Sequence, residues 1–177
     1  MSSAIMTERI SATSPRLKTK FAGVGFLLSV LIAALAEIFG RGSLNVAGVL
    51  IAVLSMIAVT LFFYDILSPV NRSLALLAAS FNLVGLAFEG LRLQPRGVNI
   101  AVVFDGFYCI LIGYLVFKST FRPRILGALA VLGGLGWLAF LSPPIANYLS
   151  PYDLAFGLLG EGSVCLWLLL ADVKVRR

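Results

Sequence analysis

Six long apolar segments limit the possible folds of this chain more than any other feature of its sequence. Each has about the ~20 residues that a helix needs to cross the ~30 Å hydrocarbon core of a bilayer. The segments are continuously apolar instead of alternating, which disfavours the strands of a membrane barrel. We therefore predict an all-α polytopic membrane helix bundle with six transmembrane helices. The segments cover roughly residues 21–40, 45–67, 73–92, 98–117, 124–142 and 153–172.

Composition supports this class of protein and argues against others. Of the 177 residues, 60% are hydrophobic and only 12% are charged, whereas charged residues make up about a quarter of a typical soluble domain. The chain has no histidine, so it offers neither histidine metal ligands nor a Ser-His-Asp triad. We expect no metal and no cofactor, and an enzymatic activity is not favoured.

The basic residues predict the orientation in the membrane. Eleven of the 14 Lys and Arg residues lie on the side of the predicted bundle that also holds both termini, and the positive-inside rule assigns that side to the cytoplasm. The chain then divides into a polar cytoplasmic tail (1–20), a six-span transmembrane domain (21–172) and a basic cytoplasmic tail (173–177). Because the positive charges flank apolar segments, they fit the headgroups of a lipid bilayer and not nucleic acid. We predict a multi-pass protein of the cell inner (cytoplasmic) membrane.

The first apolar segment allows an alternative interpretation. Lys18 and Lys20, the apolar stretch 21–33 and the Ala-Leu-Ala triplet at 34–36 together imitate a cleavable signal peptide. However, the apolar run continues beyond the triplet, and the five later segments need insertion but no cleavage. We therefore interpret the first segment as a retained span and keep cleavage as the alternative.

Carboxylates inside the predicted spans are the candidate functional residues. A charged carboxylate at mid-membrane costs about 2.5–3.5 kcal/mol on insertion scales, so such residues pair, take up a proton or line a wet cavity. In the predicted topology Asp105 and Glu161 lie deepest in the outer half of the membrane, while Glu37 and Glu89 lie nearer the outer surface. The preferred interpretation is structural, with single hydrogen-bond partners for these groups; in the alternative, the deeper pair binds a proton or a cation in a shared outer-facing cavity, with the shallower pair at its mouth.

Helical spacing adds two polar residues to this candidate intramembrane site. Asn82 falls seven positions before Glu89, and Tyr108 falls three positions after Asp105, so each shares a helix face with its carboxylate. The spacing does not show which helices are neighbours. Whether the carboxylates converge therefore stays open at the level of sequence.

Three functions from different classes are compatible with this pattern. The first, which we favour from the sequence, is a structural or interaction membrane protein, in which each polar group has a single partner in a helix seam. The second is a small proton- or cation-linked carrier that uses the carboxylates. The third is a membrane enzyme, for which a dyad of Asp105 and Glu161 is the available acid/base device. Convergence of these two residues on one water-filled cavity would separate the first function from the others.

Small residues on the predicted fifth helix, such as Ala130 and Gly134, allow another helix to approach closely. The same kind of face could join two copies of the chain into a homo-oligomer. No feature of the sequence identifies another protein partner.

Three short boxes carry a resemblance to a known family. They are PVNR at 69–72 before an Ala/Leu-rich helix, GYL at 113–115 leading to PRILG at 123–127, and Glu161 ahead of CLWL at 165–168. From about residue 20 to 172 the chain resembles the small bacterial multi-pass membrane proteins grouped as domain of unknown function four-three-eight-six. The resemblance implies a six-span helical protein of the bacterial inner membrane, with no established activity, ligand or partner.

Two positions depart from the pattern of that family. Its members often carry an arginine in the third helix near the position of Asn82, and some carry a histidine near that of Tyr108. An ion pair or histidine chemistry present in relatives is therefore not carried over to this chain.

Overall fold

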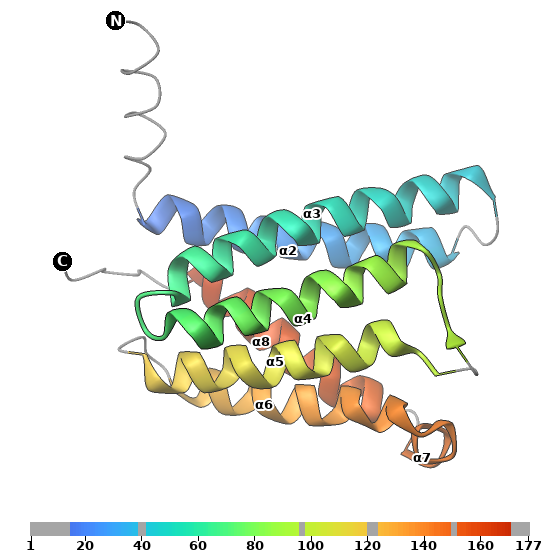
Figure 1. The fold of residues 1–177 in the computed structure, drawn as a ribbon. Helices are drawn as coiled ribbons and strands as arrows, with labels where there is room; N and C mark the ends of the chain where they lie inside the picture. The colour runs from blue at the N-terminus through green and yellow to red at the C-terminus, as the bar shows by residue number, and fades with distance from the viewer. Residues whose placement is uncertain (1–14, 39–41, 96–97, 120–123, 150–151, 171–177) are drawn as a thin grey trace, which may run out of the picture.

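A computed structural model describes residues 15–38, 42–95, 98–119, 124–149 and 152–170. Within these ranges the regular structure is helical, which confirms the predicted all-α class. Consecutive long helices run in opposite directions, and two short elements follow α6 (Figure 1). The elements are α2 (Pro15–Ile38), α3 (Ser43–Leu67), α4 (Arg72–Gly90), α5 (Ile100–Lys118), α6 (Ile125–Leu138), the 3₁₀ helix η2 (Ala139–Leu141), α7 (Pro143–Leu149) and α8 (Tyr152–Leu170).

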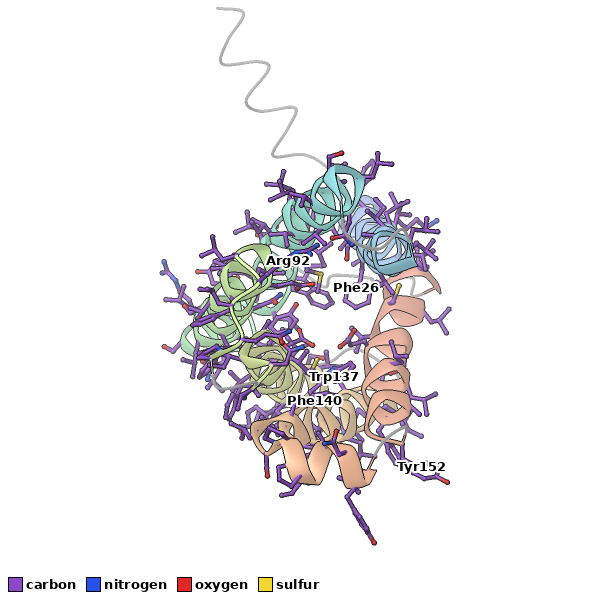
Figure 2. All side chains as sticks on the ribbon, turned by 90° about the vertical axis from the view of Figure 1, so that its right-hand side faces the viewer. Phe26, Arg92, Trp137, Phe140 and Tyr152 are labelled. Atoms are coloured by element: carbon purple, nitrogen blue, oxygen red, sulfur yellow. The ribbon has the colours of Figure 1, made fainter. Side chains whose placement is uncertain are left out.

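The long helices form a closed ring. Each packs against the next in chain order, α6 packs against α8, and α8 returns to pack against α2. Figure 2 looks along the bundle and shows this ring from one end. Because the helices alternate in direction, α2 begins and α8 ends at the same end of the bundle (Figure 1).

The six predicted apolar segments correspond to the six long helices. Among the described residues, α3, α4 and α5 are long and apolar enough to cross a bilayer, and three shorter apolar stretches lie in the other long helices. These helices indicate a membrane protein, while the six-span topology and its orientation stay predictions. The shorter stretches are Thr19–Ile32, Ile125–Leu141 and Ala155–Leu166.

Two local features differ from the expected boundaries. Helix α2 begins at Pro15, so the last part of the predicted tail 1–20 is helical. Helix α7 lies in the predicted connection after the fifth span. Proline suits the first position of a helix because it lacks the N–H that would be unpaired there, and the carbonyl of Ser142 accepts a hydrogen bond from the N–H of Ala146 at 2.9 Å.

The outer surface of the ring is rich in large apolar side chains. Leu54 on α3 is 65% exposed and Leu61 is 56% exposed, while Leu67 and Leu115 are fully buried inside. A soluble protein rarely leaves such a continuous apolar surface in water. The surface therefore fits hydrocarbon chains, in agreement with a membrane protein.

Glycines bring the backbones of α5, α6 and α8 into close contact. A Cβ atom at Gly113 would lie 2.5 Å from the carbonyl oxygen of Gly127, and one at Gly134 would lie 2.6 Å from that of Gly106. Gly133 meets α8 in the same way, with its nearest neighbour the Cα of Gly160. The small face predicted on the fifth helix is thus covered within one chain, and association of copies through such faces stays a prediction.

Candidate functional site

A cavity of about 490 Å³ occupies the middle of the helix ring. Every long helix contributes to its lining, and Figure 2 shows Phe26 of α2 and Trp137 of α6 on opposite sides of the central opening. This volume lies in the ~300–1,000 Å³ range of small-molecule sites in proteins. The cavity is therefore the first place to look for a ligand.

The base of this cavity brings together the two deepest predicted carboxylates. Asp105 of α5 and Glu161 of α8 both line it, both are half-buried, and a carboxyl oxygen of each lies within 4.8 Å of the other. The indole Nε1–H of Trp137 donates a hydrogen bond to Oε1 of Glu161. The thiol of Cys109 donates to Oδ2 of Asp105 at 3.7 Å. We call Asp105 and Glu161 the carboxyl pair.

A hydrogen bond between two carboxyl groups requires a proton on one of them, because an ionised carboxylate only accepts. Two ionised carboxylates this close would repel each other strongly in a medium of low dielectric constant. The carboxyl pair can therefore hold either one shared proton or a cation that takes the place of that proton.

The same residues also form the metal-ligand cluster of the described chain. One oxygen from each of Asp105 and Glu161 and the sulfur of Cys109 lie within 4.8 Å of one another. Two carboxylates and a thiol can coordinate a divalent cation, and a water molecule would supply a further ligand. The predicted absence of a metal stays a prediction.

The mouth of the cavity lies at the C-terminal end of α4. Glu89, Arg92 and Gln94 line the cavity and are exposed, so the cavity is open at this end. Along α4 the mouth is seven residues from Asn82, which corresponds to about 10 Å at 1.5 Å per residue. Gly85, four residues before Glu89 on the same helix, lies against the backbone of Asp105, so Asp105 is about one helical turn from the mouth.

Arg92 ties three helix ends together at this mouth. Its backbone φ of 52° is left-handed, and the N–H groups of Arg92 and Leu93 donate to the carbonyls of Glu89 and Phe88, each at 2.9 Å. Glycine usually occupies this position of the Schellman motif. The Arg92 guanidinium donates a hydrogen bond to Oδ1 of Asn45 on α3.

Asn45 is the buried link of this network. Its Oδ1 accepts from Nη2 of Arg92, and its Nδ2 donates to the carbonyl oxygen of Ala36 on α2. Asn45 is only 3% exposed, and a buried amide needs such partners. The ends of α2, α3 and α4 are therefore held together at the mouth.

The other predicted site residues lie in three different situations. Glu89 and Asn82 line the same cavity as the carboxyl pair, and Nδ2 of Asn82 donates to Oγ1 of Thr60 at 2.7 Å. Tyr108 does not line it; its ring lines a separate space of about 20 Å³ with Asp105 and Glu161. The side chain of Glu37 lies outside the described residues.

Sequence reasoning missed Trp137, Arg92 and Asn45 as parts of this region. Trp137 could be interpreted only as a packing residue inside a span, because its partner Glu161 is on another helix. Asn45 and Arg92 carried a usable signal, since both lie at the predicted outer ends of their segments.

Comparison with known proteins finds a family model that is similar to part of the chain. Residues 89–171 match the family model of Domain of unknown function (DUF4386). The predicted family resemblance is confirmed over this range. An uncharacterized protein of Archaeoglobus fulgidus is 24% identical over 142 residues, which cover 74% of this chain and 85% of that protein. No solved structure matches the chain.

The matched range has a clear relation to the cavity. It includes both residues of the carboxyl pair as well as Cys109 and Trp137. It also includes the three helices that the close glycine contacts join. The base of the cavity therefore lies wholly within the part of the chain that matches this family of unknown function.

Proposed function

We propose that this protein is a small cation-linked carrier of the cytoplasmic membrane, in which a cation and a proton compete for the carboxyl pair. The observation that supports the proposal is that Asp105 and Glu161 meet at the base of one open cavity. A purely structural role accounts for single polar contacts in helix seams, but not for a carboxyl pair facing a cavity of about 490 Å³.

The exchange follows from charge balance at the carboxyl pair. With one shared proton the pair carries one negative charge, and a second charge without compensation is costly at this depth. A monovalent cation that reaches the pair from the mouth takes the place of the proton, which leaves through the same cavity. One positive charge enters and one leaves, so the net charge of the site is unchanged.

The proposed topology has six spans with both termini in the cytoplasm. The C-terminal end of α5 and the short helix α7 lie at opposite ends of the bundle (Figure 1). Arg124, directly before α6, and Asn147 in α7 are both exposed and are suitable reporters. In this orientation the mouth of the cavity faces away from the cytoplasm.

Cysteine labelling tests this topology. We expect a membrane-impermeant maleimide to label an Asn147→Cys variant in intact cells and an Arg124→Cys variant only after permeabilisation, because the two positions lie on opposite sides. The native chain is the control, since Cys109 and Cys165 are both buried. Labelling of both variants from the same side would disprove the six-span arrangement.

Proton release in liposomes tests the carrier function. The purified chain is reconstituted with a pH-sensitive dye inside, and Na⁺, K⁺, Mn²⁺ and tetraethylammonium gradients are imposed in turn. We expect at least one of these cations to drive a pH change that Asp105→Asn and Glu161→Gln each reduce at least about tenfold, because each removes one charge of the pair. Asp65→Asn is the matched control and should behave as wild type. Asp65 is an exposed carboxylate near the C-terminal end of α3, whereas the mouth of the cavity is near the start of this helix. If every cation gives the same trace in wild type and in both variants, the carrier function is wrong.

A further inference from the structure

The walls of the cavity between its mouth and the carboxyl pair combine polar groups, such as those of Ser29 and Asn82, with apolar surface. Val30, Met56 and Val102 contribute aliphatic surface, and Phe26 and Trp137 contribute aromatic rings. Ca²⁺ takes about six to eight oxygen ligands, more than the two carboxylates and the thiol that lie together here. A cavity of about 490 Å³ with such walls instead suits a ligand that has a carbon framework.

The charges in the lining favour a positive ligand. Three carboxylates, those of Glu89, Asp105 and Glu161, line the cavity beside the single guanidinium of Arg92. The two at the base are the half-buried pair, where the low local dielectric constant strengthens attraction to a cation. An anionic ligand would meet the carboxyl pair without compensation and is disfavoured.

Trp137 places an aromatic ring at the negative end of the cavity. Its indole is 8% exposed and donates its N–H to Glu161, so the orientation of the ring is fixed by the same carboxylate that would attract a cation. Aromatic rings attract ammonium groups, with tryptophan the strongest of them. The carboxyl pair and the indole together form one end of a site for an organic ammonium group.

Arg92 limits the positive charge that a ligand can carry at the mouth of the cavity. Its guanidinium lies at the mouth and is held there by Asn45. The guanidinium of Arg92 and the carboxylate of Glu89 leave the mouth with no net charge, so a second positive charge on a long ligand would gain no net attraction there. The mouth therefore favours a ligand that carries its only positive charge at the base and a neutral group near the mouth.

We infer that the cavity binds an organic monocation, an amine or quaternary ammonium compound with an apolar body. Its ammonium group lies at Asp105 and Glu161 beside the Trp137 ring, and its body contacts Phe26, Met56 and Val102. This inference rests on the proposed function and names the class of its cation. Small inorganic cations would then bind more weakly than an organic monocation at the same site.

Binding of benzyltrimethylammonium to the purified full chain in detergent tests the inference by calorimetry. Benzyltrimethylammonium cannot lose a proton, so every proton that appears comes from the protein. We expect it to bind at least about tenfold more tightly than benzyl alcohol, phenylacetate, Na⁺ or Mn²⁺, and to release protons, which titrations in buffers of different ionisation enthalpy count. Equal binding of benzyl alcohol would overturn the inference, because the site would then recognise only the apolar body.

Three variants locate the bound cation. Asp105→Asn and Glu161→Gln should each weaken benzyltrimethylammonium binding at least about tenfold, and Trp137→Phe should weaken it about fivefold through the smaller attraction of the phenyl ring. Asp65→Asn should leave it unchanged. The wild-type ligand comparison needs no variant, so it still decides the inference if a variant does not fold.

The outcomes separate the inference from the proposed function. If Na⁺ or Mn²⁺ binds at the carboxyl pair more tightly than benzyltrimethylammonium, the inference is overturned and the cation-linked function stands. If no tested cation binds and none releases a proton, both are overturned. Tight benzyltrimethylammonium binding that the Asp105 and Glu161 variants do not weaken also overturns the inference, because the ammonium group would then lie elsewhere.

Discussion

Replacement of Gly134 by alanine lowers the melting temperature of the purified protein in detergent. A Cβ at this position would lie 2.6 Å from the carbonyl oxygen of Gly106 and 2.8 Å from Cγ1 of Ile110. The first of these neighbours is backbone and cannot turn aside, so α5 and α6 must separate. Overpacking of this kind typically costs about 1–3 kcal/mol. Circular dichroism or a dye-based thermal scan measures the effect.

Gly162 provides the control within the same chain. It lies in α8, and an added Cβ would meet nothing within 4 Å. Alanine is a better helix former than glycine by about 0.5–1 kcal/mol, so Gly162→Ala should leave the melting temperature unchanged or raise it. Gly113→Ala, where the Cβ would lie 2.5 Å from the Gly127 oxygen, should behave like Gly134→Ala. Equal melting temperatures for all three variants would show that α5 and α6 are not in backbone contact.

Replacement of Gly157 by alanine should displace the indole of Trp137. The added Cβ would lie 2.5 Å from Cζ2 of that ring, and a ring that is 8% exposed has little room to move. Displacement breaks the hydrogen bond to Glu161 and exposes the indole to the cavity. We expect a cost of about 1–3 kcal/mol and a red-shifted tryptophan emission.

A double-variant comparison is the control for the Gly157→Ala prediction. The emission is read in a Trp167→Phe background, because the chain has two tryptophans. Trp137→Phe should remove much of the clash, so the combined Gly157→Ala and Trp137→Phe variant should be more stable than the two separate effects predict. Strictly additive effects and an unchanged emission maximum would show that Gly157 does not contact the ring.

The sequence was sufficient to locate the long helices, because each predicted span is a continuous apolar run that needs no knowledge of its neighbours. The helix α3 (Ser43–Leu67) starts two residues before the predicted 45–67. The start of α2 at Pro15 could not be found from apolarity, because helical residues ahead of the span are polar. A seven-residue helix such as α7 is too short to show a periodic pattern.

The candidate site was predictable only in part, and for a different reason. Helical spacing indicates which residues share a face, and depth indicates which carboxylates need a partner. Neither indicates that α5 and α8 lie on either side of α6, which is what brings Asp105 close to Glu161. That relation depends on the order of helices around the ring, and close glycine contacts between α6 and its two neighbours determine it here.

These glycine contacts have a consequence for motion in the bundle. Where backbones touch, no side chain lies between the helices that could change its rotamer, so α5, α6 and α8 form a stiff frame. Asp105 belongs to α5 and Glu161 to α8, so both are part of this frame. We expect the distance between the two carboxyl groups to stay constant when the other helices shift. The ends of α2, α3 and α4 are joined separately through Asn45. For the proposed carrier, opening of the cavity toward the opposite side of the membrane would therefore be a rigid-body rotation of α2, α3 and α4 against α5, α6 and α8. The carboxyl pair itself would not rearrange.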